Sequence, residues 1–286
     1  MGKKGVTVRT ISPITFTIGS AVLSGIHARG SSGVPRATIL ALHGAGMSSD
    51  YFAAEPESGQ SFMQMAVSRG FNVLALDRPG YGESERHFPD GLNAREQSEV
   101  VSLVIADYSS RFDIGAGILI FAHSFGGMVA LESAASKHGL MPLALEISGL
   151  GYEPTQQAIE FRSDPRLWPF GWGPASLYSG AMLRAAQRFL RTTPKNEKSA
   201  VQVWHQLLPS LAARVTSPIR MTFAEHENWW QRHPAALDRL RRLFRSNNLT
   251  IETLNGAGHN IGLGITSSAY HRVVLAFFER VTTSAE

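Results

Sequence analysis

The sequence predicts an α/β protein with a mostly parallel central sheet flanked by helices. Short apolar runs that end at glycine alternate with segments of helical periodicity. Such runs are typical of strands buried inside a parallel sheet. The chain has 286 residues, of which 43% are hydrophobic and 17% charged, so it can bury such a sheet and is not a disordered protein.

The first elements are strands. Residues 14–18 alternate between apolar and polar side chains, and a Gly19-Ser20 turn connects them to a second strand, 21–28. Residues 37–42 form a short apolar run that ends at a Gly-rich loop. A helix around residues 62–67 follows and is stopped by Gly70, because glycine commonly ends helices. These features predict the start of an alternating strand–helix fold.

The alternation continues to about residue 151. Residues 71–76 predict a buried strand, and apolar positions between 100 and 108 have helical spacing. Residues 118–121 predict the next strand, a helix opens after Ser124, and residues 143–147 predict another strand. This order places helices on both faces of the sheet, connected by right-handed crossovers. Ligands bind such sheets beyond the carboxyl ends of the strands, where the Gly-rich motifs of this chain lie.

The middle of the chain interrupts this pattern. Pro154, Pro165, Pro169 and Pro174 break the chain after residue 151, and one helix is predicted over residues 181–190. The pattern then resumes with a strand at 219–223, a helix at 234–245, a strand at 249–254 and a helix at 268–281. We therefore expect a core domain of residues 1–151 and 218–286, with residues 152–217 inserted as a mostly helical cap.

The composition excludes several classes of protein. The chain has no cysteine, which excludes disulfide scaffolds, thiolate metal sites and a cysteine nucleophile. Its net charge of +4 comes without a base-reading motif, so no nucleic-acid partner is expected. No apolar stretch approaches the ~20 residues needed to span a bilayer, and the N-terminal segment alternates like a strand. A cytoplasmic protein without membrane association is expected.

Metal and cofactor sites are not expected either. The histidines are scattered along the chain, so no metal role is predicted. The glycine pairs 44/46 and 115/117 lack the third glycine and downstream acid of a dinucleotide fingerprint, so no nicotinamide or flavin cofactor is predicted. The expected partner is a small-molecule substrate, and a homodimer is left open.

One motif predicts chemistry. The predicted strand at 118–121 runs into Ala122-His123-Ser124-Phe125-Gly126, a small residue on each side of a central serine. A sharp strand-to-helix turn lifts such a serine above the sheet in a strained conformation, and larger neighbours would clash. The following helix directs its N-terminal amides toward developing negative charge. Ser124 is therefore the candidate nucleophile.

A base and an acid follow in chain order. His259 lies just past the last predicted strand, in a Gly-rich turn. The preceding strand ends in Ala224-Glu225-His226-Glu227, which makes Glu227 the candidate acid. Glu225 is an alternative, and so is Glu153, which follows the end of an earlier strand. Serine attacks carbonyl groups when a histidine takes its proton and a carboxylate orients that histidine.

Four motifs in this order resemble those of the α/β-hydrolase family, and the resemblance covers nearly the whole chain. The motifs are residues 43–46 (oxyanion loop), 77–84 (fourth-strand turn), 122–127 (nucleophile elbow) and 256–259 (histidine turn). The resemblance implies the order nucleophile, acid, base, and oxyanion-hole amides from Ala45 and Phe125. The usual Gly-x-x-Asp acid turn is replaced here by residues 224–227.

The aromatic residues indicate a binding pocket. All five tryptophans lie in the predicted cap or beside the candidate acid. An aromatic cap over the carboxyl edge of the sheet would form an apolar pocket, and the best candidates for its wall are Trp168, Phe170 and Trp172.

The resulting hypothesis is a cofactor-free serine hydrolase that cleaves a medium-sized apolar ester, lactone or thioester through an acyl-enzyme. The alternatives are a C–C bond hydrolase or acyl-transfer cyclase with the same triad, and a ligand-binding protein on a hydrolase scaffold, since fold alone does not set function.

Overall fold

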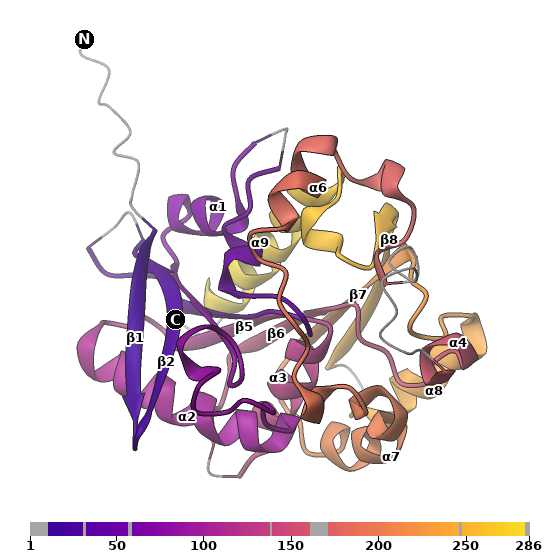
Figure 1. The fold of residues 1–286 in the computed structure, drawn as a ribbon, viewed down its shortest axis with the longest axis horizontal. Helices are drawn as coiled ribbons and strands as arrows, with labels where there is room; N and C mark the ends of the chain where they lie inside the picture. Colours follow the sequence, from indigo (N-terminus) through magenta and orange to yellow (C-terminus); the bar gives the residue numbers. More distant parts are fainter. Residues whose placement is uncertain are drawn as a thin grey trace.

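A single sheet of eight strands organises the part of the chain that the computed structural model describes, residues 11–30, 33–56, 59–137, 139–160, 171–245 and 248–283 (Figure 1). The strand order is β1-β2-β4-β3-β5-β6-β7-β8. The strands are β1 (Ser12–Ile18), β2 (Ala21–Ala28), β3 (Thr38–Leu42), β4 (Asn72–Leu76), β5 (Ile118–His123), β6 (Ala144–Ser148), β7 (Ile219–His226) and β8 (Leu249–Gly258).

The sheet is mostly parallel, as predicted. Strand β2 pairs antiparallel with β1 and with β4, whereas every pair from β4 through β8 is parallel. Strands β3 to β6 are buried at every residue, which explains their continuous apolar runs in the sequence. The carboxyl ends of these parallel strands therefore meet along one edge of the sheet.

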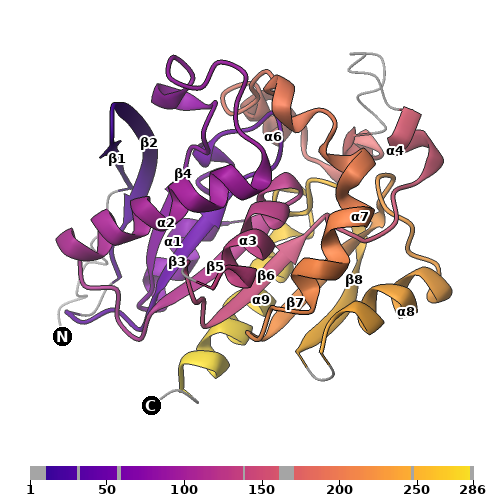
Figure 2. The same ribbon diagram turned by 90° about the horizontal axis from the view of Figure 1, so that it is seen from below.

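Helices cover both faces of the sheet, which gives three layers (Figure 1). One face packs against α2 (Ala94–Arg111), α3 (Phe125–Ala135), α7 (Ala200–Ala212) and α8 (Pro234–Leu243), which lie in front in Figure 2. The other face packs against α1 (Phe62–Ser68) and α9 (Ser267–Thr283). Capping boxes begin α1, at Ser61 and Gln64, and α2, at Asn93 and Glu96. None of the described helices is both long and apolar enough to cross a bilayer. The helices outside the β6–β7 connection are η1 (Ser49–Phe52), α1 (Phe62–Ser68), η2 (Gly82–Ser84), α2 (Ala94–Arg111), α3 (Phe125–Ala135), α8 (Pro234–Leu243), η6 (Ile261–Leu263) and α9 (Ser267–Thr283).

The regular elements described in the connection between β6 and β7 are all helices, joined by loops. Its elements are α4 (Gln156–Glu160), η4 (Ala175–Leu177), α6 (Gly180–Ala186), η5 (Lys195–Glu197) and α7 (Ala200–Ala212). The helix predicted over residues 181–190 ends earlier, at Ala186. Helix α7 was not predicted from the sequence. It contains Pro209 and packs on α3, and its Trp204 and Leu208 belong to the hydrophobic core on this face.

A buried histidine makes the fold sensitive to acid. His271 of α9 packs against the rings of Phe62 and Phe121, and its Nδ1 has no hydrogen-bond partner among the described residues. Burial lowers the pKa of His271 to about 3. The folded protein therefore binds fewer protons than the unfolded chain between pH ~6.5 and ~3, so stability falls as the pH is lowered through this window, by up to about 1.4 kcal/mol per pH unit for this group.

We expect His271→Phe to weaken this dependence, because phenylalanine fits an aromatic site and binds no proton. The measurement is the free energy of unfolding by urea at pH 7 and at pH 5. His87→Phe is the control, since His87 is exposed. A pH dependence that is the same in His271→Phe as in the parent would contradict the prediction.

Candidate active site

The predicted nucleophile lies on a strained turn between β5 and α3. Ser124 has φ 51° and ψ −121°, and it is the only non-glycine residue with positive φ within the described part of the chain. Gly126 makes the turn sterically feasible, because a Cβ there would lie 2.2 Å from the carbonyl oxygen of Leu42. The strain is typical of a functional residue that is held in place by its surroundings. The serine elbow that the sequence predicts is therefore present in the structure.

The three predicted triad side chains form one hydrogen-bonded chain. His259 Nε2 lies 3.2 Å from Ser124 Oγ, and His259 Nδ1 lies 2.9 and 3.0 Å from the two carboxylate oxygens of Glu227. A carboxylate only accepts hydrogen bonds, so Nδ1 donates and Nε2 is free to accept the serine proton. Both His259 and Glu227 are buried. The arrangement is that of a serine paired with its general base.

The two alternative acids have other partners. Glu225 accepts a hydrogen bond of 2.7 Å from the amide of Gly256. Glu153 forms a two-pronged ion pair with Arg239, with N–O distances of 2.5 and 2.6 Å, and these hydrogen bonds lower the pKa of Glu153. Glu227 is thus the carboxylate of the three that contacts His259.

The predicted oxyanion-hole residues lie next to the serine. Phe125 is the first residue of α3, and Ala45 is exposed in the turn that follows β3. Both line the same cavity as Ser124. No hydrogen bond within the described residues uses the amide of either residue. Phe125 opens a helix, and helix N-terminal amides attract negative charge, whereas Ala45 lies in a turn. The two amides remain the candidates for an oxyanion hole.

A second histidine lies next to the first, with the His123 ring centroid 4.9 Å from that of His259. The buried His123 lies 3.1 Å from Ser148 Oγ through Nδ1 and 3.1 Å from Asn260 Oδ1 through Nε2, and it stacks on Tyr51. Burial, assisted by His259, lowers the pKa of His123 well below its usual value, so the ring is neutral. Asn260 was not identified from the sequence, although it directly follows His259.

A cavity of about 1020 Å³ opens above the serine. This volume is at the upper end of small-molecule sites. Apolar side chains form one part of its wall, and polar side chains from the start of α2 and from the η5 region form another. The described apolar members include Met47, Phe125, Met128, Ala158, Trp172, Leu190, Val201, Trp229 and Trp230, and the polar ones include Asn93, Glu96, Thr193, Lys195, Asn196, Lys198 and Gln202.

The aromatic prediction has a mixed outcome. Trp172 lines the cavity as predicted, whereas Trp168 and Phe170 lie outside the described residues. Trp229 and Trp230 also line it and were not selected from the sequence. The Trp229 ring centroid is 6.0 Å from that of His259, and its amide donates to Glu227 Oε1 at 3.0 Å. Their position directly after the candidate acid is the sequence feature that could have identified these two tryptophans.

No metal cluster accompanies these groups. Among the described residues, no set of three or more His, Asp or Glu side chains is arranged to hold a metal ion. The site therefore consists of a serine, a histidine, a carboxylate and backbone amides.

Comparison with known proteins identifies the family. Residues 39–275 match the sequence model of the alpha/beta hydrolase family, and the chain belongs to this family. The hydrolase class predicted from the four motifs is thereby confirmed. No curated protein matches the chain.

Solved structures share the fold at low sequence identity. A structure described as a lipase in its open form has a TM-score of 0.71 and 18% identity, over 96% of this chain and 99% of its own. A bacterial membrane phospholipase A has a TM-score of 0.69 and 19% identity, over 95% of this chain and 86% of its own. A monoacylglycerol lipase from Paleococcus ferrophilus has a TM-score of 0.63 and 19% identity, over 92% of this chain and 99% of its own.

Proposed function

We propose that the protein is a serine hydrolase that cleaves an ester, lactone or thioester of a medium-sized apolar substrate through an acyl-enzyme. The observation that carries this proposal is the hydrogen-bonded chain from Ser124 through His259 to Glu227 at a strained elbow. A protein that only bound a ligand on this scaffold would need neither the strained serine nor its alignment with a general base.

The geometry suggests the order of events. His259 Nε2 removes the Ser124 proton as Oγ attacks the acyl carbonyl, and Glu227 stabilises the imidazolium. The amides of Ala45 and Phe125 receive the developing oxyanion. His259 then gives the proton to the leaving group, which departs and leaves Ser124 acylated. A water molecule, deprotonated by the same histidine, releases the acid.

The cavity wall supports the proposed substrate class. The tryptophans beside His259 suit an apolar acyl group, whereas the polar side chains of α2 and the η5 region suit a more polar leaving group or headgroup. We propose that residues 152–217 form the cap that supplies much of this wall, with α7 of the cap also packing on the core. The proposed substrate is therefore a small molecule.

Activity profiling tests the proposal. The purified protein is treated with a fluorophosphonate probe and assayed against chromogenic esters, thioesters and lactones of increasing acyl length. An N-acyl homoserine lactone and a monoacylglycerol belong in the panel, because solved proteins of this fold are described as an N-acyl homoserine lactonase and a monoacylglycerol lipase. Stoichiometric labelling with turnover of at least one acyl class is expected. A folded protein that neither labels nor hydrolyses any substrate would refute it.

We expect the side chain of Trp172 to determine which acyl lengths the enzyme prefers. The backbone carbonyl of Trp172 accepts hydrogen bonds from the His259 amide (3.1 Å) and the Tyr178 hydroxyl (2.8 Å), so replacing the side chain preserves these contacts. We expect Trp172→Phe to shift the ratio of kcat/KM between long and short acyl esters by about 1–2 kcal/mol, the scale of a changed pocket wall.

Trp204→Phe is the matched control for this prediction. Trp204 is buried, donates to the carbonyl of Gly151 and does not belong to the described cavity lining. Its replacement should change the stability and leave the substrate ratio unaltered. Equal changes for all substrates in Trp172→Phe would show that Trp172 only packs the cap.

A further inference from the structure

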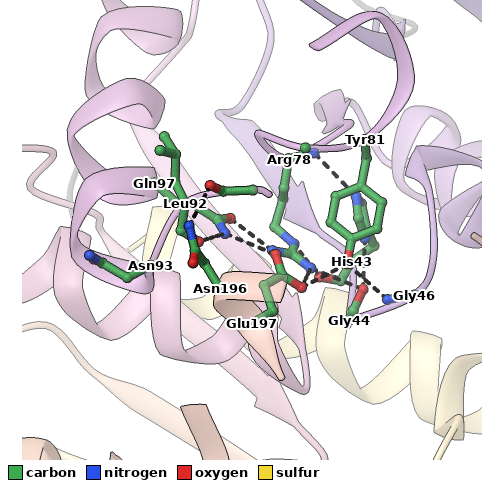
Figure 3. Close-up of polar contacts among 12 residues, drawn as sticks. His43, Gly44, Gly46, Arg78, Tyr81, Leu92, Asn93, Gln97, Asn196 and Glu197 are labelled. Atoms are coloured by element: carbon green, nitrogen blue, oxygen red, sulfur yellow. Dashed lines mark hydrogen bonds and ion pairs between the residues drawn. The ribbon is translucent and has the colours of Figure 1, made fainter. Parts of the chain in front are cut away.

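A fully buried ion pair connects the η5 segment with the core beneath the proposed oxyanion hole (Figure 3). Arg78 follows β4, and Glu197 lies 119 residues later in η5. The two guanidinium nitrogens Nη1 and Nη2 lie 2.5 and 3.2 Å from the two carboxylate oxygens, and neither side chain is exposed. Such a two-pronged pair fixes the plane of the guanidinium as well as its position.

Further donors complete the surroundings of Glu197. Gln97 Nε2 donates to Oε1 at 2.9 Å, and the Tyr81 hydroxyl donates to Oε2 at 2.7 Å. Both carboxylate oxygens therefore accept two hydrogen bonds. A buried charge is tolerated when it is paired and hydrogen-bonded in this way, so Glu197 forms a stable anchor for Arg78 and Tyr81.

Besides a hydrogen bond of 2.8 Å from Nη1 to Gln97 Oε1, Arg78 makes two hydrogen bonds to the oxyanion loop. Nε donates to the carbonyl of His43 at 2.7 Å, and Nη2 donates to the carbonyl of Gly44 at 3.1 Å. Tyr81 accepts a hydrogen bond of 2.9 Å from the amide of Gly46. Figure 3 shows these groups gathered on one side of the loop. The chain is thus held both before and after Ala45.

The hydrogen bonds to the Gly44 carbonyl are the contacts that determine the orientation of the Ala45 amide. This carbonyl belongs to the same peptide group as the Ala45 amide, and in a planar trans peptide the N–H points opposite to the carbonyl. Two donors fix this carbonyl, Arg78 Nη2 and, at 2.8 Å, His43 Nδ1. His43 Nε2 accepts from the Arg78 amide, which leaves the proton on Nδ1. Holding the carbonyl beneath the loop directs the amide of Ala45 to the opposite side.

We propose that Arg78, anchored by Glu197, is a positioning residue that orients the Gly44–Ala45 peptide so that its amide faces the oxyanion. Through Glu197, the connection between β6 and β7 takes part in building the oxyanion hole as well as the pocket wall. The proposal rests on the proposed serine-hydrolase function. A cation on the carbonyl also polarises the peptide, which strengthens its amide as a donor.

The first test is Glu197→Gln. This substitution keeps the size of the side chain and removes the charge that anchors Arg78. Oxyanion stabilisation acts in the transition state, so kcat per labelled serine should fall by about 10- to 100-fold while KM changes less. The rate of fluorophosphonate labelling should fall in parallel, and its final extent should stay stoichiometric.

A second variant separates positioning from stability. Removing both charges in the double variant Arg78→Met/Glu197→Met leaves no unpaired buried ion, so its melting temperature should exceed that of Arg78→Met alone. Its kcat should nevertheless stay at least about tenfold below the parent. Tyr81→Phe, which loses only the hydroxyl between Glu197 and the Gly46 amide, is the mildest variant and should lower kcat to a smaller extent.

Val274→Ala is the control for stability. Val274 is a fully buried residue of α9 on the other face of the sheet, so the variant should melt earlier and retain the parental kcat per labelled serine. The proposal is overturned if every folded variant of Arg78, Tyr81 and Glu197 keeps kcat within twofold of a parent that labels and turns over. A parent that fails to label instead refutes the proposed function.

Discussion

Replacing Ser124 with alanine is expected to abolish fluorophosphonate labelling and to lower kcat by at least about 10⁴-fold, because the nucleophile is lost. Serine and alanine carry the same Cβ, so the strained backbone at φ 51° experiences no new clash and the melting temperature should stay close to that of the parent. Labelling is followed by in-gel fluorescence and turnover by ester hydrolysis.

Ser133→Ala is the matched control for this experiment. Ser133 lies on the same helix, α3, and its hydroxyl donates to the carbonyl of Val129 inside that helix. This variant should label and turn over like the parent. If Ser124→Ala labels as strongly as the parent, the nucleophile lies elsewhere and the elbow assignment is wrong.

Glu227→Gln should lower kcat by about 10³- to 10⁴-fold with little change in substrate binding. The carboxamide can donate to His259 Nδ1, which would shift the proton to Nε2 and leave no base for the serine. It also removes the charge that stabilises the imidazolium. The Trp229 amide that donates to Glu227 Oε1 keeps an acceptor in the amide oxygen, so the local fold should persist.

Glu225→Gln and Glu153→Gln are the controls, because their carboxylates bind the Gly256 amide and Arg239. Both variants should stay within a few-fold of the parental kcat. A large loss in Glu153→Gln, with Glu227→Gln near the parental rate, would move the acid to the end of β6.

The fold was predictable where local pattern and tertiary position agree. The buried strands read as apolar runs because both their faces are covered, and β2 has the predicted bounds, 21–28. Helix α7 escaped prediction because Pro209 interrupts its pattern, although Trp204, Leu208, Leu211 and Ala212 lie on one buried face. The packing of α7 against α3 tolerates a proline that local propensity disfavours.

The site residues that directly follow predicted strands could be identified from the sequence. Ser124 and His259 each follow a strand, whereas the sequence left Glu225 and Glu153 as alternatives to Glu227 for the acid. Glu225 and Glu227 are two residues apart and would share one face of a regular strand. The register shift between Ala224 and His226 disrupts that regularity, and a shift of this kind leaves no trace in the sequence. Arg78 and Glu197 form an ion pair although they are 119 residues apart in the sequence. No local sequence pattern could therefore predict this pair.

The position of β7 and β8 at one end of the sheet has a consequence for synthesis. Ser124 and His259 are separated by 135 residues, which at about 5–20 residues per second means a delay of about 7 to 27 s between their incorporation. During this interval Ser124 lacks His259, its hydrogen-bond partner in the folded chain. The hydrogen-bonded chain from Ser124 through His259 to Glu227 can therefore form only after β7 and β8 have been synthesised.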